Sequence, residues 1–134
     1  MSEKVTSGEG YAVGNLADLG EGPGFRKVRR ELEVTAFGVN AIVLPAGTET
    51  GRHFHDEQEE LYFVHEGRVE MEFGDGTTHT LVPGGLARVD APTVRLIRNP
   101  GDTDAVYLVV GGKDGYVGRD GRVPEGETQR VRPI

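Results

Sequence analysis

Short apolar runs separated by turn residues recur along the whole chain. Between positions 68 and 73, charged and apolar side chains alternate, as they do in a strand with one buried face. Gly74-Asp75-Gly76 follows, and these turn residues predict a hairpin that returns over 78–82. Because 21 glycines and 7 prolines punctuate a chain of 134 residues in this way, the pattern predicts an all-β sandwich or barrel.

About ten strands with short connections are expected. They lie at 11–13, 25–32, 32–37, 39–44, 60–65, 69–73, 78–82, 86–89, 95–99 and 105–111, with a single helical turn at 15–19. The segment 25–32 is ambiguous, because Phe25, Val28 and Leu32 would also share one face of a short helix. A strand is favoured there because strand-like sequence follows directly.

The chain is long enough to bury a core as one domain. We expect residues 1–10 to be a flexible, frayed N-terminus and 11–112 to form a single β-barrel domain. The polar segment 113–134 is expected to be an arm that lies either over the barrel or on a second subunit.

Two histidines and a glutamate are concentrated between Gly47 and Gly67. His53 and His55 are two positions apart, so both rings leave the same face if the segment is extended. Glu60 follows after four intervening residues, in the next expected strand, from which its carboxylate can return to the same point. Two imidazoles and a carboxylate are suitable ligands for zinc, manganese, iron or nickel.

The complete spacing of this segment resembles the first sequence motif of the cupin family. Gly47, five residues, His53-x-His55, four residues, Glu60, six residues and Gly67 fit that motif position for position. The resemblance implies a double-stranded β-helix, or jelly-roll barrel, in which the two histidines and the glutamate hold a divalent transition metal.

Two further expectations come from the same resemblance. Glu59 also lies within the family's spacing from the histidines, but counting from Glu59 breaks the six-residue interval to Gly67, so Glu60 is the expected ligand. Cupins commonly dimerise through sheet edges, and closing an exposed edge is a physical reason to do so. A homodimer is therefore expected.

The family's second motif, Gly-x5-Pro-x-Gly-x2-His-x3-Asn, is present only at its ends. Aligning those ends on Gly84 and Asn99 places Asp90, Pro92 and Arg95 where the family has proline, glycine and the last histidine ligand. An arginine offers no lone pair to a metal and stays charged, so the usual site of three histidines and one glutamate is incomplete. Asn99 is expected to be structural, as it usually is in cupins.

Arg95 leaves three alternatives open. If its side chain points inward, its charge must be paired, either by Glu60 in place of a metal or by an anionic ligand that the guanidinium grips with two hydrogen bonds. If the local sequence instead shifts the strand, Arg95 extends to the barrel mouth with its charge in water.

Strand parity assigns directions to the other candidate residues. Tyr62 and Val64 share the parity of Glu60 and should line the cavity, where the Tyr62 hydroxyl is a candidate substrate contact or a filler of the core. His65 has the opposite parity and should point away from the site. His79 has no motif partner and is interpreted as structural.

Composition excludes several classes of protein. A formal charge of −7 and a pI near 5.1 argue against nucleic-acid or anionic-membrane partners, which require basic patches. The absence of cysteine excludes disulfides and thiolate chemistry. No signal-peptide core is seen, and the longest apolar run, 105–110, is too short to cross a bilayer, so a cytoplasmic location is expected.

Two main functional hypotheses follow, and enzyme status stays open between them. The first is a metal-dependent dioxygenase, isomerase or decarboxylase, with His53, His55 and Glu60 as ligands and Arg95 holding a small anionic metabolite. The second is a non-catalytic barrel that binds a small molecule, with a Glu60–Arg95 pair in place of the metal. A structural subunit with a decayed site is the third reading.

Overall fold

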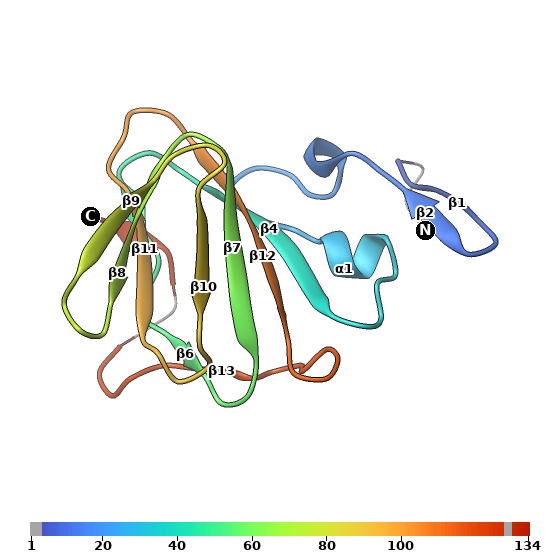
Figure 1. Cartoon of the computed structure of the whole chain (residues 1–134). Coiled ribbons are helices and arrows are strands. Elements are labelled where there is room, and N and C mark those ends of the chain that lie inside the picture. The colour runs from blue at the N-terminus through green and yellow to red at the C-terminus, as the bar shows by residue number, and fades with distance from the viewer. Residues whose placement is uncertain (1–3, 128–129) are drawn as a thin grey trace.

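Two five-stranded antiparallel sheets form the body of the protein (Figure 1). The computed structural model describes residues 4–127 and 130–134. In chain order the described elements are β1 (Thr6–Gly8), β2 (Tyr11–Val13), η1 (Leu16–Asp18), β3 (Gly24–Arg26), α1 (Val28–Glu31), β4 (Gly38–Leu44), β5 (Thr48–Glu49), β6 (Phe54–His55), β7 (Glu59–Glu66), β8 (Val69–Phe73), β9 (Thr78–Leu81), β10 (Leu86–Val89), β11 (Arg95–Asn99), β12 (Ala105–Gly112), β13 (Gly121–Arg122) and β14 (Arg132–Pro133).

The strand order confirms the predicted architecture. The first sheet runs β10-β7-β12-β4-β3 and the second runs β14-β5-β11-β8-β9, while β1 pairs with β2 and β13 pairs with β6. Neighbouring strands are antiparallel throughout the two large sheets. This is the double-stranded β-helix, or jelly-roll barrel, that the sequence predicts.

Alternation along β7 decides which side chains face the interior. Glu60, Tyr62 and Val64 are buried, whereas Leu61 and Phe63 between them are exposed. The predicted parity is therefore confirmed. The apolar core between the two sheets contains Leu44, Tyr62, Val64, Val69, Met71, Val89, Ile97, Ala105 and Tyr107.

Both glycines of the first motif have a backbone conformation that other residues avoid. Gly47 has a φ of 73° and Gly67 a φ of 69°, in the left-handed region that favours glycine. A Cβ on Gly67 would also lie 2.7 Å from the carbonyl oxygen of Asp104. Gly67 therefore lets the turn after β7 pass close to the start of β12.

The segment before β4 corrects two strand predictions. The strand expected over 25–32 is wrong for its second half, which forms α1, and the strand expected over 32–37 is wrong throughout, because the chain there turns and bends. Glu33 has a φ of 57°, and the N–H of Val34 donates to the carbonyl of Arg29 at 2.9 Å. This helix-ending motif uses backbone groups that a strand would need for its ladder.

A hairpin precedes the barrel. Residues 1–3 of the expected flexible N-terminus lie outside the described part, and β1 pairs with β2 in a hairpin beside the barrel (Figure 1). The flexibility of 1–10 stays a prediction. The helical turn expected at 15–19 is confirmed as η1, where the Asn15 side chain caps the turn by accepting from the N–H of Ala17 at 3.0 Å.

The described part of the C-terminal arm, residues 113–127 and 130–134, lies over its own barrel. In Figure 1 it passes below the barrel, where β13 pairs with β6, and β14 then joins the second sheet beside β5. Arg132 pairs with Glu49 at 2.9 Å and with Glu127 at 3.1 Å. Of the two placements that the sequence leaves open, the structure has the arm over the barrel. In the described part, no helix is long and apolar enough to span a membrane.

Candidate metal centre

Two strands and an isolated bridge bring the predicted ligands together. His53 forms an isolated bridge with Arg95, in which the two backbone N–H groups donate to the opposite carbonyls at 3.0 and 2.9 Å. His55 lies two residues further along, in β6, and its N–H donates to the carbonyl of Ala91 at 2.7 Å. Glu60 comes from β7, across the barrel interior.

The three side chains converge as the spacing predicts. One ligand atom from each of His53, His55 and Glu60 lies within 4.8 Å of the other two. The imidazole rings are 5.4 Å apart and nearly perpendicular, at 82°. Glu59, the competing carboxylate, is exposed and pairs instead with Arg88 at 3.0 Å, so the structure favours Glu60.

Glu60 is held as a buried carboxylate. Burial raises its pKa, but the adjacent His55 ring, the hydrogen bond from Tyr62 and the charge of Arg95 together outweigh burial, so the pKa lies below its usual value. The Tyr62 hydroxyl donates to Glu60 Oε1 at 2.6 Å. Burial and the neighbouring Glu60 charge raise the pKa of Tyr62 well above its usual value, so Tyr62 remains a hydrogen-bond donor.

His53 is held neutral. Burial and the positive charge of Arg95 lower the pKa of His53 to about 4. A neutral imidazole keeps a lone pair for a metal ion at neutral pH.

Arg95 is fully buried, which excludes the alternative in which it extends to the barrel mouth. Its Nη2 donates to the carbonyl of Asp90 at 2.9 Å, and its Nη1 lies 3.8 Å from Glu60 Oε1. Nε and Nη1 have no hydrogen-bond partner among the described residues. Arg95 is absent from the residues that line the cavity, so its geometry favours a contact with Glu60 over a direct contact with a substrate.

Two further residues belong to the site, Gln58 and Asp120, which no sequence pattern predicts. Gln58 Nε2 lies 3.2 Å from His55 Nδ1, and Asp120 Oδ2 lies 3.6 Å from the same atom. Asp120 reaches the site from the C-terminal arm, which pairs with β6. No spacing rule connects Asp120 to the histidines; the one local signal is that Asp120-Gly121 reads as a turn in a polar segment.

The donor set fits a divalent metal. His55 Nε2 lies 3.2 Å from Glu60 Oε1, yet Nε2 is buried without a hydrogen-bond partner among the described residues. Two acceptor atoms this close require a proton or a cation between them. Metal bonds of roughly 2.0–2.2 Å to nitrogen and oxygen suit this separation, and His53 supplies a third ligand.

The three candidate ligands line a cavity of about 420 Å³. This volume is within the range of roughly 300–1,000 Å³ that small-molecule sites have. Ile42, Ile97, Tyr107 and Val109 provide much of its apolar wall, and Asn40, Gln58 and Tyr62 add polar groups. The C-terminal arm contributes Tyr116, Val117, Arg119 and Asp120. Tyr62 therefore lines the cavity, as predicted.

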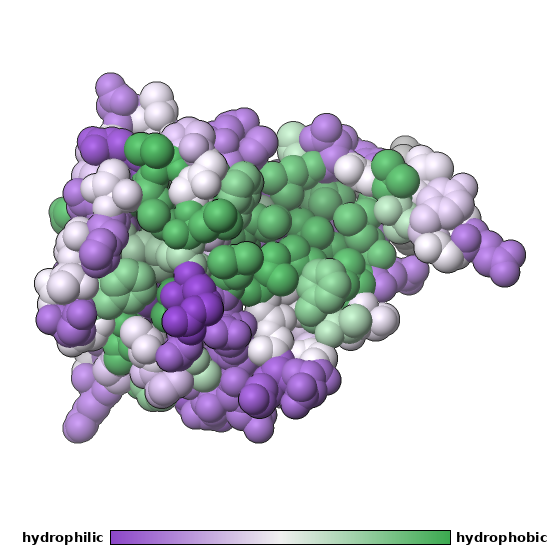
Figure 2. Space-filling view, viewed as in Figure 1, coloured by the Kyte–Doolittle hydropathy of each residue, from purple (hydrophilic) through white to green (hydrophobic). Residues whose placement is uncertain are grey.

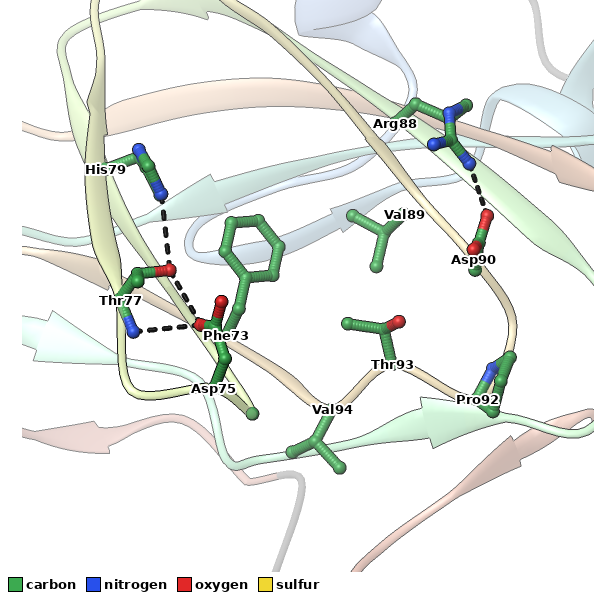
Figure 3. A pocket seen from close by; sticks show the side chains of 11 residues that line it. Phe73, Asp75, Thr77, His79, Arg88, Val89, Asp90, Pro92, Thr93 and Val94 are labelled. Carbon is green, nitrogen blue, oxygen red and sulfur yellow. Dashed lines mark hydrogen bonds and ion pairs between the residues drawn. The ribbon is translucent and has the colours of Figure 1, made fainter.

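A second pocket of about 630 Å³ lies between the β8–β9 hairpin and the β10–β11 connection (Figure 3). Its polar side chains bond to one another: Asp75 accepts from the Thr77 hydroxyl at 2.7 Å, and Arg88 pairs with Asp90. His79 lies 3.3 Å from the Thr77 hydroxyl oxygen, which agrees with its structural interpretation. His65 is exposed beside Glu66 and points away from the metal centre.

Fold and cluster together define a β-barrel protein with a candidate metal centre of two histidines and one carboxylate. The family model for the Cupin domain matches residues 40–111, more than half of the chain. The chain therefore belongs to the cupin family. A search of curated proteins finds no match.

Solved structures agree with this fold. The alignment with a sugar phosphate isomerase of the cupin superfamily from Silicibacter pomeroyi covers 73% of this chain and 68% of the isomerase chain, with a TM-score of 0.54 and 29% identity. DMSP lyase DddQ from Ruegeria pomeroyi covers 68% of this chain but only 45% of its own, with a TM-score of 0.60 and 24% identity. An uncharacterized protein with a double-stranded β-helix domain from Klebsiella pneumoniae covers 67% of this chain and 76% of its own, with a TM-score of 0.60 and 20% identity.

Proposed function

We propose that this protein is a metal-dependent enzyme that acts on a small anionic metabolite. The observation that carries the proposal is the convergence of His53, His55 and Glu60 within 4.8 Å at the wall of a cavity of small-molecule size. A metal held by these three residues would have room for further ligands, as in the two-histidine, one-carboxylate sites of non-haem iron enzymes. Zinc, manganese, iron and nickel all suit these donors.

Charge supports an anionic substrate. Glu60 and Asp120 bring two negative charges to the site, while Arg95 and a divalent ion bring three positive ones. The site therefore keeps a net positive charge in a largely apolar cavity, where an anion is the favoured ligand. The solved structure that is 29% identical is a sugar phosphate isomerase, and a phosphorylated sugar is an anion.

The chain's own residues have separable roles in this proposal. A divalent metal bound at the three ligands would act as a Lewis acid on a substrate oxygen. Tyr62 holds Glu60 in place through the hydrogen bond of 2.6 Å and presents its ring to the cavity. Arg95 balances the Glu60 charge from behind, and the apolar walls exclude water from the bound substrate. Isomerase, decarboxylase and dioxygenase chemistry are all compatible with this arrangement.

A second candidate function is a non-catalytic small-molecule-binding cupin. The ion pair between Arg95 and Glu60, at 3.8 Å, favours it, because this pair would stand in place of the metal. The lack of a hydrogen bond between the two groups makes it the weaker candidate.

Activity of the metal-loaded protein separates the two functions. Untagged protein loaded with zinc, manganese, iron or nickel is incubated with small carboxylates and sugar phosphates, and products are followed by NMR and oxygen uptake. The enzyme proposal expects turnover that Glu60→Gln abolishes and that Glu59→Gln, the same change on the exposed neighbour, leaves intact. Ligand binding without turnover under every metal would instead support the non-catalytic barrel.

We also propose a homodimer, formed through the outer face of the first sheet. Phe63 on β7 is the register partner of Leu86 on β10 and of Leu108 on β12. Leu61 lies two residues before Phe63, on the same face of β7. Leu61, Phe63 and Leu86 are 42, 37 and 58% exposed, and Figure 2 shows hydrophobic surface gathered over β7, β12 and β4. Contiguous apolar patches are uncommon on monomers, and a two-fold dimer would bury the same face of both copies. Location in the cytoplasm remains a prediction.

A further inference from the structure

Asp120 lies beside the ligand candidate His55, although it belongs to the distant C-terminal arm. We propose that Asp120, together with Gln58, holds the His55 imidazole in the tautomer that carries its proton on Nδ1, and so presents Nε2 to the metal. This inference rests on the metal-binding function proposed above. It makes the C-terminal arm part of the metal centre.

Asp120 is a fixed acceptor next to the ring. Its carboxylate is only 3% exposed, and Oδ2 lies 3.6 Å from His55 Nδ1. Oδ2 also accepts from the backbone N–H groups of Glu57 and Gln58 at 3.0 and 2.8 Å. Oδ1 also lies 3.2 Å from the N–H of Glu57, so backbone donors reach both oxygens and the carboxyl group serves as an acceptor.

Gln58 supplies the second acceptor. Its Nε2 lies 3.2 Å from His55 Nδ1, while its Oε1 is buried without a hydrogen-bond partner among the described residues. The nitrogen and oxygen of an amide are interchanged by a half-turn of the group. That half-turn places Oε1 against Nδ1 and gives the orphaned oxygen a donor. Both neighbours of Nδ1 are then acceptors, so Nδ1 carries the proton.

The other ring nitrogen is consequently free to bind a metal. Nε2 bears the lone pair of this tautomer and faces Glu60 Oε1 at 3.2 Å. Metal-bound histidines generally donate their second N–H to a carboxylate or carbonyl, which fixes the ring and raises its basicity. Asp120 and Gln58 occupy that position here, so each acts on the metal through His55.

Backbone pairing fixes the distance between Asp120 and the ring. Gly121 is the register partner of His55 in the β13–β6 pair, and the N–H of Asp56 donates to the carbonyl of Asp120 at 3.2 Å. Asp56 also pairs with Arg122 at 2.7 Å. These contacts join the arm to the ligand strand directly beside Asp120.

The tautomer of His55 in zinc-loaded wild-type protein tests the proposal. Long-range ¹H–¹⁵N NMR at pH 8 distinguishes the two ring nitrogens. The expected result is a proton on Nδ1 and zinc on Nε2. A proton on Nε2, with zinc on Nδ1, would overturn the proposal. The zinc content of the same sample distinguishes that outcome from failure of the proposed function, in which no zinc binds and the inference fails with it.

Asp120→Asn provides the second measurement, with Glu125→Gln as the matched control. Both variants remove one negative charge from the C-terminal arm, but Glu125 is exposed and takes no part in the contact with the ligand strand. Asp120→Asn should weaken zinc binding by about 10- to 100-fold, while Glu125→Gln stays within about twofold of wild type. Equal zinc affinity in wild type and folded Asp120→Asn, checked by the amide spectrum, contradicts the proposal.

Discussion

Arg95 occupies the position at which the cupin motif has its last histidine ligand. Its backbone pairs with that of His53, and its buried guanidinium lies 3.8 Å from Glu60, so a side chain at 95 is directed at the ligand cluster. Arg95→His would replace a repelling charge with a fourth ligand. We expect metal affinity to rise by at least tenfold, or about 1.4 kcal/mol, measured by competition with a chelator.

Arg98→His is the matched control for this change. Arg98 belongs to the same strand but pairs on the outside of the barrel with Glu49 and Glu72, both at 3.4 Å. Its replacement should leave metal affinity unchanged. If Arg95→His binds metal no better than wild type, the side chain at position 95 does not reach the metal centre.

His53 should make the metal-free protein sensitive to acid. Its pKa is about 4 in the folded protein and near 6.5 in an unfolded chain, so between these values the unfolded state binds more protons and stability falls as pH decreases. The shift corresponds to about 3 kcal/mol. Urea unfolding in the presence of EDTA measures the free energy of unfolding at pH 7 and at pH 4. Between these pH values, wild type should lose about 3 kcal/mol more than His53→Gln loses. Equal losses in the two proteins would contradict the assigned environment of His53.

The ligand residues could be predicted because their signal is local. His53, His55 and Glu60 lie within eight consecutive positions, and strand parity places their side chains on facing walls. Asp120 and the burial of Arg95 could not be predicted in this way. Both depend on which distant strands become neighbours, and single-sequence spacing carries no information on that.

At the scale of elements, the C-terminal arm is expected to support the metal centre. Its β13 pairs with the ligand strand β6, its Asp120 contacts His55, and its β14 extends the second sheet. Deletion of 113–134 should lower the melting temperature and weaken zinc binding by at least tenfold, as measured by calorimetry. Loss of Asp120 alone accounts for this lower bound.

Deletion of residues 1–13 is the contrasting control. The β1–β2 hairpin lies away from β6 and β7, the strands that carry His55 and Glu60 (Figure 1), so its removal should leave zinc affinity unchanged even if the protein becomes less stable. Equal effects of the two deletions on zinc binding would show that the arm acts only through general stability.

Strands with clear alternation could be predicted, and segments stabilised by caps could not. The predicted strand over 69–73 and the hairpin turn after it are confirmed as β8 and its connection to β9. The segments 25–32 and 32–37 carry apolar residues that suit either a strand or a helix, and a helix-ending turn at Glu33 decided between them. Such a turn normally uses glycine, so no sequence signal marked it.

At the scale of the whole molecule, the outer face of the first sheet should control assembly. Phe63→Lys places a charge in the centre of the proposed dimer contact, where it would be buried without a partner. Sedimentation analysis should show a dimer for wild type and a monomer for Phe63→Lys. Val123→Lys, which adds the same charge at an apolar residue that is 43% exposed in the arm, should remain a dimer. A monomeric wild type would refute the proposed dimer.

The metal content of untagged protein tests the central claim most directly. After incubation with zinc, manganese, iron or nickel and removal of excess metal, elemental analysis should find close to one ion per chain. The double variant His53→Ala/His55→Ala should bind none, whereas His65→Ala/His79→Ala, which removes the two histidines outside the cluster, should keep the full amount. Wild type without metal under every condition, or full occupancy in His53→Ala/His55→Ala, would contradict the assignment of His53, His55 and Glu60 as a metal centre.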